Sequence, residues 1–139
     1  MDRIKAFING RYENSDGEFL IKINPVSGVP IARVEKTDNA LLEKAIHGAK
    51  IAQSEWCSLT GQERGQIMKH AGGMLAASLK ELTMLEVRDV GEAWSEAISA
   101  VVPCGAEANE YFGSLAATMT GNSHKWKNAR GFAERVPLG

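Results

Sequence analysis

Residues 56–64 read Trp-Cys-Ser-Leu-Thr-Gly-Gln-Glu-Arg and decide how the helical part of the chain is laid out. Thr60 and Glu63 have the spacing of a capping box, in which the Thr hydroxyl accepts from the third helical N–H and the Glu carboxylate accepts from the N–H of the cap. Trp56 ends one amphipathic pattern and Glu63 begins the next. The stretch therefore predicts a helix–turn–helix corner, against which we expect the rest of the chain to pack.

Helical patterns surround this corner and together span residues 38–120. The pattern before it places its apolar side chains on one stripe at 100° per residue. Its members are Leu41, Leu42, Ala45, Ile46, Ala49, Ala52 and Trp56. The pattern after it contains Gly72-Gly73, which costs roughly 1 kcal/mol per Gly relative to Ala. A close helix crossing would explain the pair.

Further helices are predicted beyond the second one. Ser78 and Glu81 repeat the capping-box spacing and begin a helix that stops at Gly91. Its inward face carries Glu86 and Asp89 besides its leucines, and such acids are expected to meet an Arg, a helix N-terminus or an ion. A short helix is expected over residues 92–100. Another begins with Pro103 in its first turn and ends at Gly121. The count is four or five amphipathic helices.

Short strands are predicted on both sides of the helices. Residues 4–34 alternate between strands and turns, with turn signals at Asn9-Gly10, at residues 15–17 and at residues 24–28. Residues 122–130 are polar and loop-like, and residues 131–139 are expected to form a terminal strand. The fold class is therefore α+β, with residues 1–139 as a single domain.

Composition narrows the classes of function. Sixteen basic against seventeen acidic residues leave a net charge of −1, which gives no electrostatic case for nucleic acid or an anionic membrane. No apolar run approaches the roughly 18 residues of a membrane span, and the N-terminus lacks the apolar segment of a signal peptide. Two cysteines are too few for a disulfide scaffold and favour reduced thiols. A cytoplasmic protein is expected.

Residues that carry chemistry are scarce. Phosphate-loop, dinucleotide-loop, nucleophile-elbow and zinc-helix motifs are all missing from the sequence. His47, His70 and His124 have no second ligand at a useful spacing and are expected to be solvated or structural. Cys104 follows Pro103 near a predicted helix start, where the helix dipole would favour a thiolate, but no base is paired with it. The residues themselves predict no catalytic and no cofactor-binding site.

Five segments in order give the chain a family resemblance. They resemble the N-terminal part of the NAD(P)-dependent aldehyde dehydrogenase superfamily, and the last of them reads Arg-Val-Pro-Leu-Gly. Residues 56–64 and 111–121 are most similar to the betaine-aldehyde and trimethylaminobutyraldehyde branch. The segments are 7–10 with 23–32, then 56–64, 85–93, 111–116 and 135–139.

The resemblance implies an oxidoreductase family whose catalytic parts lie elsewhere. Its members attack the aldehyde with a thiolate, pass a hydride to NAD or NADP and hydrolyse the thioester. The nucleophilic Cys, the general-base Glu and the cofactor glycines correspond to positions beyond Gly139, and neither Cys57 nor Cys104 has the nucleophile's context. The chain then corresponds to the first quarter to third of the enzyme, without the Rossmann core. Residues 131–139 would begin the oligomerisation strand, and no cofactor is expected to bind this chain alone.

One binding site of the family would fall inside the chain. In betaine-aldehyde-type members a monovalent cation, K⁺ or Na⁺, is held by two main-chain carbonyls before Asn-Pro and by the Asp near the end of the third helix. The matching positions are Lys22, Ile23 and Asp89. Oxygen ligands suit such a cation. The alternative is an Asp89 that caps a backbone turn.

Two hypotheses about function follow. The first is a partial chain of an aldehyde dehydrogenase, inactive alone, whose partners are other copies or full-length subunits. The second is a truncated, non-enzymatic paralogue that acts as an interaction module on full-length subunits through its exposed strand edges.

Overall fold

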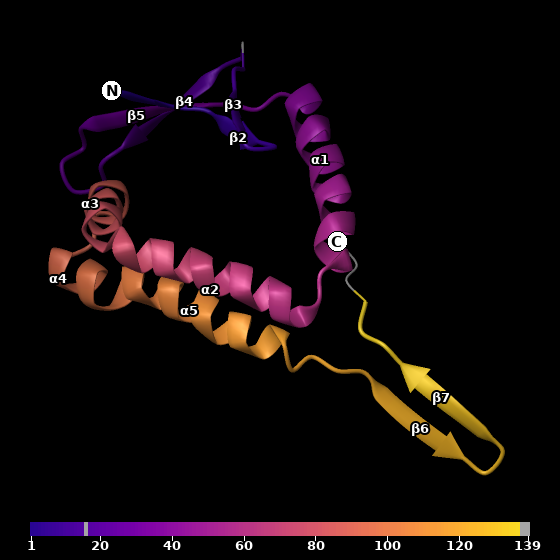
Figure 1. The fold of residues 1–139 in the computed structure, drawn as a ribbon. Coiled ribbons are helices and arrows are strands. Elements are labelled where there is room, and N and C mark those ends of the chain that lie inside the picture. The colour runs from indigo at the N-terminus through magenta and orange to yellow at the C-terminus, as the bar shows by residue number, and fades with distance from the viewer. Residues whose placement is uncertain (16, 137–139) are drawn as a thin grey trace.

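The computed structural model describes residues 1–15 and 17–136, and it has the predicted α+β order of elements (Figure 1). The predicted turn at 15–17 includes Asp16, and the predicted end of the terminal strand includes residues 137–139; these positions lie outside the described residues. The strands are β1 (Asp2–Ile4), β2 (Ala6–Ile8), β3 (Arg11–Glu13), β4 (Phe19–Ile23), β5 (Pro30–Glu35), β6 (Asn122–Trp126) and β7 (Ala129–Ala133). The helices are α1 (Asn39–Ser58), α2 (Gly61–Ala77), α3 (Leu79–Val90), α4 (Trp94–Glu96), the π-helical turn η1 (Ala97–Val101) and α5 (Val102–Ala116).

The N-terminal strands form two small sheets. β5 is central in the first, antiparallel to β4 and parallel to β1, with Asp2 opposite Ala32. β2 and β3 form a separate antiparallel hairpin. Its turn is the predicted Asn9-Gly10, and both residues have positive φ, 52° and 78°. That is the backbone that a tight hairpin turn requires, so this prediction is confirmed.

The predicted corner forms between α1 and α2. The backbone N–H of Glu63 donates to the Thr60 hydroxyl at 3.2 Å, and the N–H of Thr60 donates to the Glu63 carboxylate at 2.7 Å. The second predicted capping box is wrong. Ser78 makes no side-chain cap bond, because its N–H bonds to the carbonyls of Met74 and Leu75 and keeps it within the last turn of α2. The extended backbone of a cap is therefore not available there.

The capping box formed by Thr60 and Glu63 should make the thermal stability of the chain depend on pH. The backbone N–H of Thr60, followed by its hydroxyl, lowers the pKa of Glu63 below 4.5. A carboxyl group with a lower pKa in the folded state contributes stability above its unfolded pKa and loses it as pH falls through the folded value. We expect Glu63→Gln to reduce the loss of thermal stability on acidification below pH 4.5, measured by circular dichroism. Glu81→Gln, at the same spacing from Ser78 but without a box, is the matched control; an equal effect of both variants would contradict this origin.

The expectation that the chain packs against both helices of the corner is wrong for α1. α1 stands apart from α2 and meets the β2–β3 hairpin instead, where Lys44 pairs with Glu13 at 2.7 Å (Figure 1). Its predicted apolar stripe is largely open, with Leu42, Ile46 and Trp56 all exposed. The stripe is amphipathic as predicted, but its apolar side has no covering layer within the described residues.

The principal helix pair is α2 and α5, which lie side by side (Figure 1). Small residues allow their backbones to approach closely. A Cβ added to Gly65 would clash with the carbonyl oxygen of Gly113, and one added to Gly72 would lie 2.9 Å from the carbonyl oxygen of Ala106. A close helix crossing, the explanation offered for the pair, is therefore present at Gly72. Gly73 has no neighbour within 4 Å of such a Cβ, and nothing in the structure explains it.

The predicted interruption before Pro103 is also wrong. The helical backbone runs without a break from Trp94 through η1 to Ala116, and Val101 has α-helical φ and ψ. A π turn places its hydrogen bonds one residue further along and can absorb a proline, which lacks an N–H and clashes with the preceding turn. Pro103 therefore lies in the first turn of α5, as predicted, but α5 continues the helix that begins at Trp94 without an interruption.

Residues 122–130, predicted as a loop, form most of a β-hairpin. β6 pairs antiparallel with β7, Asn122 opposite Ala133, and the pair projects away from the other elements (Figure 1). The Trp126 ring lies over Gly131, where an added Cβ would come within 2.6 Å of it. The terminal strand thus starts at Ala129, before the predicted 131. The turn of this hairpin is polar and poor in glycine, so the sequence carries no strong hairpin signal there.

The whole chain is open. Its accessible surface is 10,702 Å², about half as large again as the roughly 7,000 Å² expected for a compact protein of this mass. Only Ile8, Ala32 and Ala97 form a buried apolar core among the described residues. Phe132 on the hairpin is 80% exposed. None of the described helices combines the length and apolar character that a bilayer crossing requires.

Candidate functional site

The turn between β4 and β5 docks on the C-terminal end of α3. Asn24 holds this turn, because its side-chain oxygen accepts from the N–H groups of Val26 and Ser27, both at 2.9 Å. Its side-chain nitrogen donates to the carbonyl of Arg88 at 2.9 Å. Asn followed by Pro is a typical start for such a turn. One side chain therefore shapes the turn and ties it to the helix.

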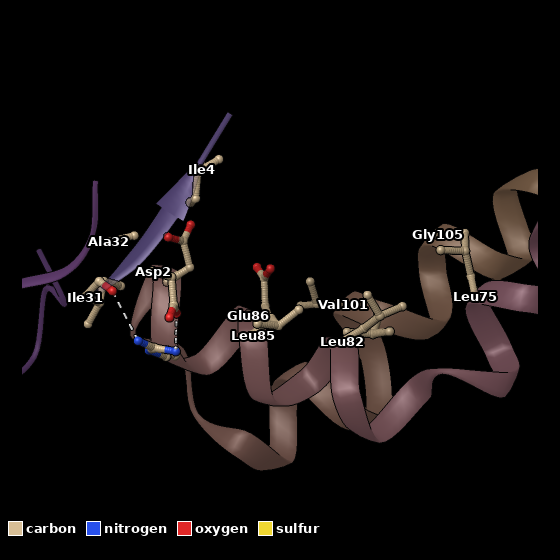
Figure 2. Close-up of a pocket in the computed structure, with 13 residues that line it drawn as sticks. Asp2, Ile4, Ile31, Ala32, Leu75, Leu82, Leu85, Glu86, Val101 and Gly105 are labelled. Atoms are coloured by element: carbon tan, nitrogen blue, oxygen red, sulfur yellow. Dashed lines mark hydrogen bonds and ion pairs between the residues drawn. The ribbon is translucent and has the colours of Figure 1, made fainter. Parts of the chain in front are cut away.

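Arg88 makes the second connection between the sheet and α3. Its guanidinium donates to the Asp2 carboxylate on β1 at 3.1 Å and to the carbonyl of Ile31 on β5 at 3.2 Å (dashed lines in Figure 2). Lys and Arg in the last turn of a helix also interact favourably with its dipole. Arg88 thus joins three elements, and sequence reasoning did not identify it because both partners lie more than fifty residues away.

Gly91 ends α3 and permits the close contact with the turn. It has φ of 80° and donates its N–H to the carbonyl of Val87, as a left-handed helix cap does. A Cβ at this position would lie 2.8 Å from carbons of both Pro25 and Val26. The predicted helix end at Gly91 is confirmed, and the residue serves both the cap and the docked turn.

Two of the three predicted cation-site residues, Lys22 and Asp89, are in contact where the β4–β5 turn meets α3, through the Lys22 ammonium and not through its carbonyl. The ammonium nitrogen of Lys22 lies 3.1 Å from a carboxylate oxygen of Asp89, with the two side chains 37% and 55% exposed. Lys22 and Ile23 flank a shift in the β4–β5 register. The prediction that Asp89 turns toward an interior is wrong: Asp89 and the half-buried Glu86 do share a face, but that face is open.

A free K⁺ or Na⁺ at Asp89 would have to share this carboxylate with Lys22. Two unit charges about 4 Å apart repel by about 1 kcal/mol in bulk water and about 4 kcal/mol at an effective dielectric constant of 20. The described residues contain no cluster of three or more acidic, His or Cys side chains that would offset this repulsion. The side chains therefore suit one positive charge beside Asp89, and Lys22 already supplies it. Binding of a free cation remains a prediction.

A cleft of about 530 Å³ lies beside the junction, between the sheet and the helices (Figure 2). Its walls are mainly aliphatic and come from β1, β5, α2, α3, η1 and α5. Figure 2 labels Ile4, Ile31, Leu75, Leu82, Leu85 and Val101 among its lining residues. Aliphatic side chains make up most of this lining, and Asp2, Glu86, Arg88 and Asp89 add charged groups, so the cleft fits a mainly apolar binding surface.

The remaining candidates for chemistry are spread over the molecule. Cys57 on α1 and Cys104 on α5 are free, exposed thiols. Because the helix runs continuously from Trp94, Cys104 does not lie at a helix start, and the argument for a dipole-activated thiol there is wrong. His47, His70 and His124 are exposed on α1, α2 and β6, respectively, as expected for solvated side chains.

Glu35 carries the other marked electrostatic feature of the sheet. Its nearly buried carboxylate accepts from the N–H of Ser15 at 2.9 Å and pairs with Arg3. The Ser15 hydrogen bond, with the help of Arg3, lowers the pKa of Glu35 although burial opposes this. Arg33 stacks 5.0 Å from the ring centre of Phe19 nearby. These contacts connect β1, β4 and β5 and are structural.

The sequence is similar to that of a known protein family. The pattern of the "Aldehyde dehydrogenase family" matches residues 12–139. Betaine aldehyde dehydrogenase 2 of Rhizobium meliloti (strain 1021) is 38% identical over 134 residues, which cover 96% of this chain and 28% of that protein. Betaine aldehyde dehydrogenase of Rhizobium etli (strain CIAT 652) is 38% identical over 135 residues, again 96% of this chain and 28% of the relative. The chain thus spans about 28% of the length of these curated relatives.

Solved structures share the fold. Indole-3-acetaldehyde dehydrogenase in its apo form is 28% identical with a TM-score of 0.83, covering 90% of this chain and 29% of that one. PnpE in complex with nicotinamide adenine dinucleotide is 25% identical with a TM-score of 0.86, covering 90% and 26%. Lactaldehyde dehydrogenase from Escherichia coli, at 22% identity and a TM-score of 0.85 over 91% and 27%, supports the fold alone.

Proposed function

Because this chain belongs to the aldehyde dehydrogenase family, we propose that it is the N-terminal part of an NAD(P)-dependent enzyme that oxidises an aldehyde to a carboxylic acid, and that it is not catalytic by itself. One observation carries the proposal: nearly the whole chain matches the family, yet it spans only about 28% of its relatives. The family resemblance assigns the nucleophile, the general base and the cofactor glycines to positions beyond Gly139.

The open structure supports a role as a covering and supporting segment. An isolated compact domain buries its apolar side chains, whereas here the α1 stripe, the cleft and the β6–β7 hairpin are all exposed. Residues 1–139 then act as one partial domain whose exposed apolar surfaces are covered by the rest of the enzyme. The hairpin and the residues after it would begin the strand through which subunits assemble.

Relatives suggest which substrate and cofactor to test first. The most similar curated relatives given above are named betaine aldehyde dehydrogenases, and one solved structure with this fold holds nicotinamide adenine dinucleotide. Betaine aldehyde with NAD is therefore the first pair for the complete enzyme. The family resemblance also implies that K⁺ or Na⁺ binds to the complete enzyme. Two free thiols fit the reducing environment of the cytoplasm, which we propose as the location.

The alternative is a non-enzymatic module that binds full-length subunits. The exposed edges of the β6–β7 hairpin favour this hypothesis, since unpaired strand edges can add to a partner's sheet. Such a module would co-purify with a full-length relative at micromolar concentration, and failure to do so would exclude it. Transcript sequencing past Gly139 separates the two hypotheses further, because an in-frame stop there would count against the partial enzyme.

Complementation tests the proposed function directly. The chain would be co-expressed with a betaine aldehyde dehydrogenase relative from which the matching N-terminal segment has been removed, and NADH formation would be followed by absorbance. We expect no NADH from either part alone and activity from the two together. NADH formation by this chain alone would contradict the proposal.

A matched pair of variants shows whether the cleft makes the contact. Leu85 and Met84 are neighbours on α3 and are 52% and 62% exposed, but only Leu85 lines the cleft. Leu85→Glu buries a charge in the proposed contact and should reduce complementation about tenfold or more, the equivalent of 1.4 kcal/mol. Met84→Glu should reduce it much less. Equal effects would mean that the cleft is not the covered surface.

A further inference from the structure

We propose that the Lys22 ammonium is the built-in counter-cation of Asp89 and takes the place of a free K⁺ or Na⁺ beside these residues. The inference goes beyond the proposed function, because it concerns the ionic requirement of this segment and not the reaction. The Lys22 nitrogen lies 3.1 Å from the Asp89 carboxylate, within ion-pair distance.

Among the described residues, Lys22 is the cation that pairs with Asp89. Arg88, its neighbour in the chain, directs its guanidinium to Asp2 and to the carbonyl of Ile31. Lys22 reaches Asp89 from another element, β4, and both residues stand at the ends of the segments that meet at the junction. Two ion pairs therefore form here, Arg88 with Asp2 and Lys22 with Asp89, and the Glu86 carboxylate lines the same cleft.

The junction holds the ammonium close to its partner. Asn24, two residues after Lys22, bonds to the carbonyl of Arg88, next to Asp89. Lys22 is also paired with Ala32 in the sheet. A cation attached in this way has a high effective concentration at Asp89, whereas a free ion must be captured from solution. A compact ammonium also carries the same unit charge as K⁺ or Na⁺.

The test measures thermal unfolding of the 139-residue chain in KCl, NaCl or choline chloride at equal ionic strength, without aldehyde or NAD. The parent chain should have the same midpoint in all three salts, because Lys22 already neutralises Asp89. Lys22→Met should unfold about 2–5 °C lower in choline chloride and recover in KCl or NaCl. A saturable rise of the parent midpoint in KCl or NaCl alone would overturn the proposal.

Two further variants make each result decisive. In Lys22→Met with Asp89→Asn, the response to K⁺ or Na⁺ should disappear; if it persists, the ion binds elsewhere and the proposal fails. Lys36→Met breaks a comparable exposed pair with Glu18, 2.6 Å long, and should show no preference among the salts. A Lys22→Met chain that ignores the salt, or that folds in none of them, would also overturn the assignment. Failure of complementation would leave these midpoints unaffected, so the two proposals fail independently.

Discussion

Replacing Gly65 by Ala is expected to lower the free energy of unfolding by about 2–4 kcal/mol, the upper range for overpacking a close contact. The added Cβ would meet the carbonyl oxygen of Gly113 and the side chain of Ala116, so α2 and α5 must move apart. Their contact is the most extensive helix pairing of the described chain. Urea unfolding followed by circular dichroism would measure the change as a lower midpoint.

Gly73 provides the matched control in the same helix. A Cβ at this position has open space within 4 Å, so Gly73→Ala should stabilise the chain by up to about 1 kcal/mol through helix propensity. Gly113→Ala introduces the same clash from the facing helix, at 2.8 Å from the carbonyl oxygen of Gly65. Its effect should not add fully to that of Gly65→Ala, since both variants relieve strain by the same separation. A Gly65→Ala chain as stable as Gly73→Ala would contradict the close crossing.

Replacing Gly91 by Ala is the second large effect, and two causes contribute to it. A residue with a side chain at φ of 80° costs roughly 1–2 kcal/mol, and the contacts at 2.8 Å with Pro25 and Val26 add further strain. The total should be about 2–4 kcal/mol. The turn should also come away from α3, which faster hydrogen exchange of the Val26 and Ser27 amides would detect, because Asn24 accepts from both.

A variant at Gly10 distinguishes the backbone strain at Gly91 from the strain of its contacts with Pro25 and Val26. Gly10 has nearly the same φ as Gly91, 78°, but an added Cβ there has no neighbour within 4 Å. Gly10→Ala therefore reports the backbone strain alone, about 1–2 kcal/mol. The difference between the variants measures how firmly the turn is docked. Equal losses from both would show that Pro25 and Val26 yield freely and that the junction is loose.

The candidate site shows how far the family resemblance predicts the contacts of this chain. Lys22 and Asp89 were named for the same site, and the structure does bring them together. The expected ligand from Lys22 was its carbonyl, whereas the observed contact is its ammonium. The contacts that hold the junction, from Asn24 and Arg88, were not predicted, because their partners lie 57 to 86 residues away. No local pattern carries information about such distant pairs.

The sequence by itself determined the features that depend on a few neighbouring residues. These are the capping box at Thr60, the hairpin turn at Asn9-Gly10 and the helix end at Gly91, because side-chain chemistry and allowed φ act within about four residues. Only the tertiary structure decided that α2 pairs with α5, that α1 stands apart and that residues 122–133 form a hairpin. The first two outcomes depend on which distant surfaces bury one another, and an amphipathic stripe does not specify its partner. The hairpin is local, but its polar turn carries no strong hairpin signal.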